Sequence, residues 1–99
     1  MELPALSALG HHDEAIAEAG RALELAPSSP TINHALGYIL HFAGRPSDAI
    51  PPIQKALDLD PTFGPGYRTL ALAQAAAGKA DQAIELLKQL IARNPADRH

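Results

Sequence analysis

The stretch ALELAP at residues 22–27 returns 34 residues later as ALDLDP at residues 56–61. The same period relates four sets of identical residues along the chain of 99 residues: Gly10, Gly44 and Gly78; Ala15, Ala49 and Ala83; Ile16, Ile50 and Ile84; Pro27, Pro61 and Pro95. Four columns in one register indicate an internal repeat. A period in this range is typical of architectures built by stacking one supersecondary unit on the next.

Each repeat predicts two helices with the recurring glycine between them. Over residues 31–43, apolar residues follow the i, i+3, i+4, i+7 spacing of a helix with one buried face. Gly44 is expected to end this helix by taking a positive φ, and Pro46 suits the first turn of the next one. The last repeat follows the same plan over residues 65–77 and 80–93. Since no segment alternates at period two, the predicted fold class is all-α.

Two adjacent prolines, Pro51 and Pro52, fall within the second helix of the middle repeat. A proline inside a helix removes a hydrogen bond to the residue four positions earlier, at a cost of about 3 kcal/mol or more. We therefore expect this helix to start late, near Ser47 and Asp48, with a kinked or 3₁₀ first turn.

Composition narrows the class of protein. Hydrophobic residues make up 46% and charged residues 19%, which is unlike a disordered tail or a coiled-coil rod. The net charge of -3 disfavours nucleic acid and an anionic membrane as partners. No apolar run approaches the ~20 residues of a membrane span. Because the first residues also lack the basic start of a secretory signal, a cytoplasmic location is expected.

The repeat resembles the tetratricopeptide repeat, a helix–turn–helix unit of the same length. The matching residues are Leu36, Gly37, Gly44, Ala49, Ala56 and Pro61 in the middle repeat, and Tyr67, Leu70, Ala71, Gly78, Ala83 and Pro95 in the last. The resemblance implies a single right-handed α-solenoid of antiparallel helix pairs over residues 1–99. Its repeats would be a truncated first one at 1–29, a second at 30–63 and a third at 64–97. Asn33 departs from the pattern, because the family usually has an aromatic residue there, and a locally looser fit is expected.

Both ends of the array are irregular. The first helix of the first repeat is expected to shorten to residues 3–9, and no capping helix is expected among the four residues after Pro95. Repeat arrays usually need caps, because a terminal repeat exposes the face meant for its neighbour. Two interpretations stay open: the chain is a piece of a longer one, or two chains cover each other's ends in a homodimer. In the second case, the contact residues are expected on the last helix: Leu86, Leu87, Leu90 and Ile91.

The resemblance also implies that the first helices of successive repeats line a concave groove in which peptides bind. The groove positions are Thr31, His34, Tyr38 and His41 on the middle repeat, with Arg68 and Leu72 on the last. This mixture suits an extended or helical peptide, and an acidic one is favoured because arginine binds carboxylates well. The contrary hypothesis, a solvated face with no partner, also stays open.

No constellation of residues predicts catalysis or a metal site. His34 and His41 share a helix face, but about 10.5 Å of helical rise separates them, too far for one zinc ion. The pair at residues 11–12 lacks the HExxH spacing of zinc proteases, and no serine stands in a nucleophile elbow. We therefore expect a noncatalytic scaffold for protein–protein interaction, without cofactor or metal. The alternatives are a self-assembly module and a small-ligand sensor using His34, Tyr38 and His41.

Overall fold

The computed structural model describes residues 11–93. It contains five α-helices in this range: α2 (His12–Leu25), α3 (Pro30–Phe42), α4 (Pro46–Leu59), α5 (Gly64–Ala76) and α6 (Ala80–Arg93). No residue from 11 to 93 lies in a β-strand, and the predicted all-α fold class is confirmed. The shortened first helix predicted at residues 3–9 lies outside the described residues.

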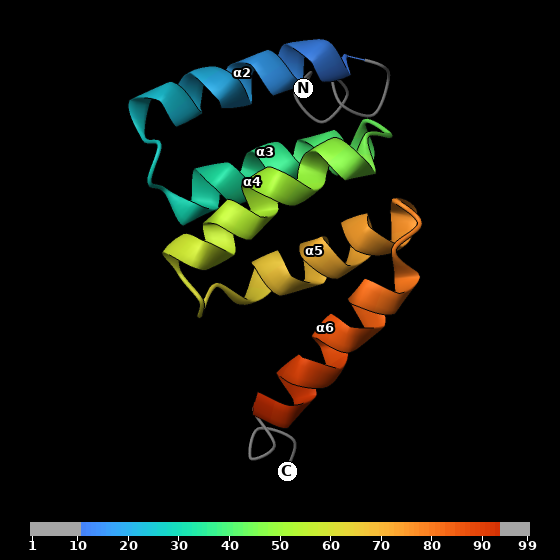
Figure 1. Ribbon diagram of the computed structural model, residues 1–99. Helices are drawn as coiled ribbons and strands as arrows, with labels where there is room; N and C mark the ends of the chain where they lie inside the picture. Colours follow the sequence, from blue (N-terminus) through green and yellow to red (C-terminus); the bar gives the residue numbers. More distant parts are fainter. Residues whose placement is uncertain (1–10, 94–99) are drawn as a thin grey trace.

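The helices form a stack whose contacts follow the order of the chain. α2 packs on α3, α3 on α4, α4 on α5 and α5 on α6, while α3 also touches α5. Figure 1 shows this order, from α2 at one end of the molecule to α6 at the other. Each helix therefore packs on helices that are close to it in sequence, as in a solenoid of helix pairs.

Local sequence sets where the helices begin and end. α3, α4 and α5 each have a proline in the first or second position, where its missing N–H leaves no helical bond unmade. At the end of α3, Gly44 has φ +79°, and the N–H groups of Gly44 and Arg45 donate to the carbonyls of His41 and Leu40. α5 ends with equivalent hydrogen bonds at Gly78, where φ is +82°. Both helices thus end in a Schellman turn at the repeated glycine, and the predicted positive φ of Gly44 is confirmed.

The core lies between α3, α4 and α5. Ala49 and Ile53 of α4 have 0% exposed surface, and they belong to one buried cluster with Leu40 of α3 and with Leu70 and Ala73 of α5. The side of α4 that faces α3 and the side that faces α5 are therefore both buried. α4 is therefore packed on one side against α3 and on another side against α5.

Two glycines set the spacing on either side of α4. A Cβ atom at Gly37 in α3 would overlap the Ile53 side chain and lie 3.0 Å from the carbonyl oxygen of Ala49. A Cβ atom at Gly66 in α5 would lie 2.8 Å from Cδ2 of Leu57. Because real Cβ atoms do not approach other heavy atoms so closely, both helices pack on α4 through a position without a side chain.

The expectation of a late helix start and a 3₁₀ first turn before Pro51 and Pro52 is wrong. α4 begins at Pro46, ahead of the predicted late start, and is α-helical through both prolines. The hydrogen bonds that the prolines remove fall on the exposed residues Ser47 and Asp48, whose carbonyls can accept from water instead. Packing of the opposite, fully buried face of α4 holds the helix in place.

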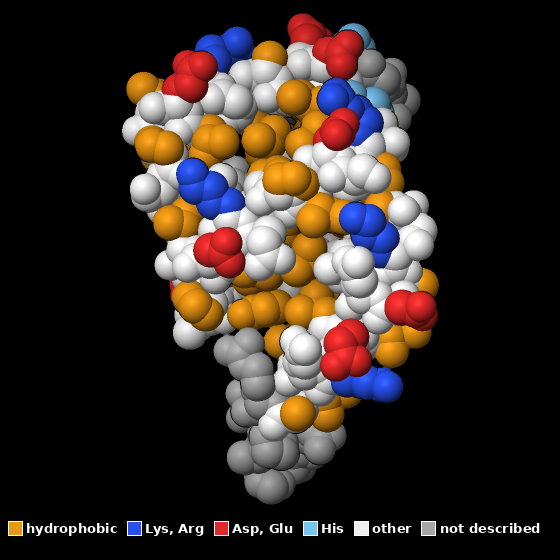
Figure 2. Space-filling model, in the orientation of Figure 1, with side chains coloured by type: hydrophobic (Ala, Val, Ile, Leu, Met, Phe, Trp, Pro, Cys, Tyr) orange, Lys and Arg blue, Asp and Glu red, His pale blue; other side chains and the backbone are white. Residues whose placement is uncertain are grey.

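The surface mixes charges of both signs. On the face in Figure 2, hydrophobic side chains run between acidic and basic ones, and neither sign gathers in one region. Two ion pairs, Arg21 with Glu18 and Arg45 with Asp48, each span 3.0 Å across exposed helix surface. Among the helices that the structure describes, none combines the length and the apolar character needed to cross a membrane.

Candidate protein-binding surface

The predicted groove residues of the middle repeat lie on one face of α3. Thr31 and Tyr38 are exposed, and His34 and His41 are half-buried. His34 is the point at which this face meets α5, because its Nε2 atom lies 2.8 Å from Oγ1 of Thr69. The α3 part of the predicted groove is thereby joined to the start of α5.

Four rings follow one another along this face, and we call them the ring row: Phe63, His34, Tyr38 and Phe42. Their centroids are separated by 5.2, 6.0 and 4.7 Å in that order, within the usual range for aromatic pairs. Tyr38 is 48% exposed and Phe42 is 55% exposed. His41 adds a fifth ring beside the row, 5.2 Å from Phe42.

Two members of the ring row were not among the predicted groove residues. Phe42 could have been found, because it lies four positions after Tyr38, as Tyr38 does after His34, and residues at this spacing share a helix face. Phe63 stands in the loop just before α5. No periodicity applies there, so only the three-dimensional packing places its ring against His34.

The hydrogen bonds around His34 indicate the tautomer of its neutral ring. The Thr69 hydroxyl donates to the carbonyl oxygen of Pro65 at 3.2 Å, so it accepts from Nε2 of His34 at 2.8 Å. The proton of the neutral imidazole therefore sits on Nε2. Burial lowers the pKa of His34 below its ordinary value of 6.5, because desolvation disfavours the charged ring. The centre of the ring row is therefore uncharged at neutral pH.

Asn33 and Tyr67 tie each first helix to the loop before it. Asn33 is 1% exposed, and its Nδ2 atom donates to the carbonyls of Pro27 at 3.1 Å and Ser29 at 2.9 Å. One period later, the Tyr67 hydroxyl donates to the carbonyl of Pro61 at 2.6 Å. The expectation of a looser fit at Asn33 is therefore wrong. The short amide and the phenol make the same contact in successive repeats.

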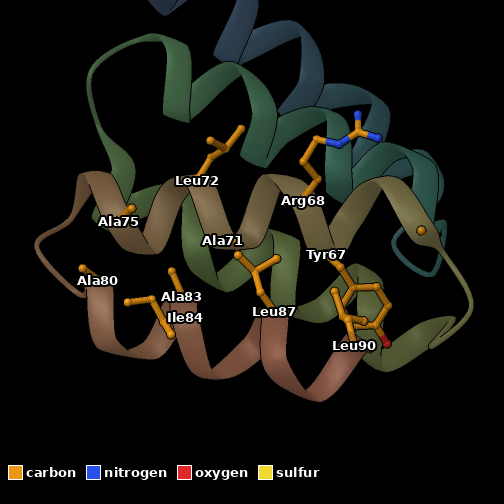
Figure 3. Close-up of a pocket in the computed structure, with 11 residues that line it drawn as sticks. Tyr67, Arg68, Ala71, Leu72, Ala75, Ala80, Ala83, Ile84, Leu87 and Leu90 are labelled. Carbon is orange, nitrogen blue, oxygen red and sulfur yellow. The ribbon is translucent and has the colours of Figure 1, made fainter. Parts of the chain in front are cut away.

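The predicted groove residues of the last repeat, Arg68 and Leu72, line a second feature, a hollow of about 590 Å³ between α5 and α6. We call it the α5–α6 hollow; its other lining residues are Gly64, Tyr67, Ala71, Ala75, Ala80, Ala83, Ile84, Leu87 and Leu90. In Figure 3, Ala71 faces Leu87 in the middle of the hollow, and Arg68 and Leu72 rise from its α5 rim. Its lining is almost wholly apolar, apart from Arg68 and the Tyr67 hydroxyl.

The four residues predicted for self-association divide into three environments. Leu86 packs against the core cluster, whereas Leu87 and Leu90 line the α5–α6 hollow. Ile91 is 52% exposed and does not line the hollow. The leucines at 86 and 90 are half-buried, so the free apolar surface is concentrated at Leu87 and Ile91.

The candidate metal and catalytic groups are dispersed. Within residues 11–93, no three histidine, aspartate or glutamate side chains come together as a metal site would require. His11, at the start of α2, instead contacts Glu14 at 3.0 Å across the exposed first turn.

Stacked helix pairs of one repeated length define a helical repeat protein. Two tetratricopeptide repeat family models match the sequence, one over residues 1–62 and the other over residues 42–99. The chain belongs to the tetratricopeptide repeat family, whose repeats generally mediate protein–protein interactions.

A curated relative carries the same repeat in its name. The chain is 29% identical over 83 residues to the small glutamine-rich tetratricopeptide repeat-containing protein 2 of Mycosarcoma maydis. The match covers 84% of this chain but 24% of that protein, so the chain spans about a quarter of the relative's length.

Proposed function

We propose that this chain is a noncatalytic scaffold that binds a peptide or protein segment along α3 and the start of α5. The contact residues are the ring row together with Thr31, His41, Arg68 and Leu72. The observation that carries the proposal is the exposure of Tyr38 and Phe42, 48% and 55%, at the end of a row that continues through the rings of His34 and Phe63. Aromatic residues, tyrosine among them, are enriched among the few residues that dominate binding energy in protein interfaces.

The ring row also indicates the chemistry of the bound segment. Because His34 is neutral and hydrogen-bonded to Thr69, it does not attract acidic groups at neutral pH. Apolar or proline side chains suit the exposed faces of Tyr38 and Phe42, since they lose little on leaving water. An acidic group of the segment would meet Arg68 at the edge of this surface.

Selection from a random peptide display library tests the proposal without a known partner. The selected peptides are titrated calorimetrically into the wild-type chain, into Tyr38→Ala/Phe42→Ala and into the control Lys55→Ala. Lys55 is exposed on α4, away from the ring row. We expect the double variant to bind the peptides about tenfold or more weakly, and the control to bind them normally. Unchanged affinity in a folded double variant would remove the ring row from the binding site.

A second candidate function is self-assembly through the last helix. Ile84 and Ile91 of α6 are each 52% exposed and Leu87 is 46% exposed, which is a large apolar surface for one helix. Sedimentation velocity over a concentration series tests it, with Ile91→Glu as the variant. Dimers that dissociate on this substitution support the function, and a monomer at high micromolar concentration contradicts it.

A further inference from the structure

The ring row lies inside the stack, away from both ends of the described chain. Its helix, α3, is packed by α2, α4 and α5, so the exposure of Tyr38 and Phe42 is not that of a terminal helix. His34 occupies the middle of the row, with the Phe63 ring 5.2 Å away on one side and the Tyr38 ring 6.0 Å away on the other. A polar ring between two aromatic rings offers a bound segment a hydrogen-bonding atom that can fix its register.

The two ring nitrogens of His34 have different surroundings. Nε2 lies 2.8 Å from Oγ1 of Thr69, which donates its own proton to the carbonyl of Pro65. Nε2 therefore carries the ring proton, and Nδ1 keeps its lone pair. Within residues 11–93, Nδ1 of His34 forms no hydrogen bond and is not buried, whereas Nδ1 of His41 is buried without a partner. His34 thus presents an accessible acceptor on a ring that is fixed through its other nitrogen.

No charged side chain within residues 11–93 forms an ion pair or a hydrogen bond with His34. α5 brings the exposed Arg68, which is next to Thr69, and the loop before α5 brings Asp60, whose carboxylate accepts two hydrogen bonds from Thr62. The aspartates, glutamates, lysine and arginine of α2 and α4 are all exposed. On α3 itself, the titratable neighbour is the Tyr38 phenol. The acceptor at Nδ1 is therefore not neutralised by a cation of its own chain.

We infer that Nδ1 of His34 accepts a hydrogen bond from an N–H group of the bound segment, and that this bond selects which segments the ring row holds. The inference rests on the proposed function and adds a specificity-determining residue to it. A proline nitrogen or a carboxylate at the same place would leave the lone pair without a partner. Proline thus suits Tyr38 and Phe42 but not the position over His34. The donor is a backbone amide or a side-chain N–H, such as that of a tryptophan indole.

Nitrogen NMR of the histidine rings tests the acceptor in the free chain, before any ligand is added. We expect Nε2 of His34 to carry the proton at pH 7.5 and Nδ1 to be unprotonated. When a peptide binds, the Nδ1 resonance of His34 should shift toward that of a hydrogen-bonded nitrogen, and the ring nitrogens of His41 should shift less. A proton on Nδ1 in the free chain overturns the inference and leaves the proposed binding site unaffected.

Methylated peptides test the bond from the side of the ligand. The probes are peptides selected from the random library on the full chain, without aspartate, glutamate or histidine, so that only the protein titrates. Backbone nitrogens are methylated one at a time, and any tryptophan is replaced by 1-methyltryptophan. We expect one methylation to weaken binding to the wild-type chain about tenfold and to have no effect on binding to His34→Phe. His41→Phe is the matched control, because it removes the other histidine of this face and should leave the loss on methylation unchanged.

Which methylation is coupled to His34 distinguishes the two sources of the donor. Coupling at a backbone nitrogen identifies an amide of an extended segment, and coupling at 1-methyltryptophan identifies an indole. If every methylation weakens binding to the wild-type chain and to His34→Phe equally, Nδ1 accepts no bond from the segment and the inference is overturned.

Acid provides an independent measurement. A protonated Nδ1 donates instead of accepting, so affinity should fall by up to about tenfold per pH unit below the pKa of His34 in the free chain. His34→Phe should lack this dependence, and His34→Gln serves the same purpose if the phenylalanine variant does not fold. Constant affinity over the pH range in which NMR shows His34 taking up its proton overturns the inference.

Tyr38→Ala/Phe42→Ala separates this inference from the proposed function. If the double variant loses affinity but no methylation is coupled to His34, the ring row is the binding site and only the role of Nδ1 is wrong. If the double variant binds the peptides normally, the ring row is not the site and the inference fails with it.

Discussion

Alanine substitution at Gly37 and Gly20 measures how closely α3 and α4 are packed. Both glycines lie inside helices, and neither has a positive φ. Alanine gains about 0.5–1 kcal/mol over glycine in a helix interior, so this gain is common to both variants. A Cβ atom at Gly20 would meet nothing within 4 Å, whereas one at Gly37 would overlap Ile53, which has 0% exposed surface. Overpacking a filled core costs about 1–3 kcal/mol.

The two variants should therefore move stability in opposite directions. Gly20→Ala is expected to raise the free energy of unfolding by about 0.5–1 kcal/mol. Gly37→Ala is expected to lower it by up to about 2.5 kcal/mol after the helix gain is subtracted. Urea unfolding followed by circular dichroism measures both, and an unchanged dependence on urea shows that the same folded and unfolded states are compared. Equal stabilisation by both substitutions would refute the close approach of α3 to α4.

Three further predictions follow from single side chains. Because the pKa of His34 is lowered in the folded chain, the unfolded chain binds a proton at a higher pH than the folded chain does. The free energy of unfolding should therefore fall as pH drops below about 6.5 and level off below the folded pKa. His34→Gln should lessen this loss in melting experiments at pH 7.5 and 5.5. Asn33→Ala removes two hydrogen bonds from a buried side chain and should cost about 2–4 kcal/mol in urea unfolding. Tyr67→Phe removes the hydrogen bond to Pro61 and should cost about 0.5–1.5 kcal/mol in the same assay. A larger loss than at Asn33 would contradict the shared role.

The order and the ends of the helices could be predicted closely from the sequence, because identical residues recur every 34 positions. Identical glycines one period apart predict where α3 and α5 end, since only that residue adopts a positive φ without strain. The prolines at 51 and 52 show where such reasoning fails. Local preference disfavours a helix there, but burial of Ala49 before them and Ile53 after them holds α4 together. The packing of the buried side chains outweighs the helix penalty of the two prolines, and the sequence alone does not show which of the two effects is larger.

The candidate site is less accessible to sequence reasoning. Helical spacing groups His34 with Tyr38, and it extends to Phe42 when four positions are added again. It does not reach Phe63, which lies in a loop, or the hydrogen bond that joins His34 to Thr69 in the next repeat. The family pattern also does not predict the hydrogen bonds of Asn33, because a pattern records which residue type is usual at a position and not which hydrogen bonds that residue makes. Asparagine replaces an aromatic side chain there and keeps the contact to the preceding loop.

The fifth position of each repeat carries a side chain that suits how far it is covered by the neighbouring helices. In the middle repeat this position is His34, and α5 packs beside it. The imidazole is therefore half-buried and forms a hydrogen bond with Thr69 of α5. In the last repeat it is Arg68, and the structure describes no helix beyond α6 to cover it, so the guanidinium stays exposed beside an apolar hollow. A neutral ring suits the first setting, because burying a charge without a partner is costly. An arginine suits the second, because an exposed guanidinium keeps its contact with water. Within residues 11–93, the same geometric position therefore carries a neutral, hydrogen-bonded ring where a helix packs over it and an exposed charge where none does.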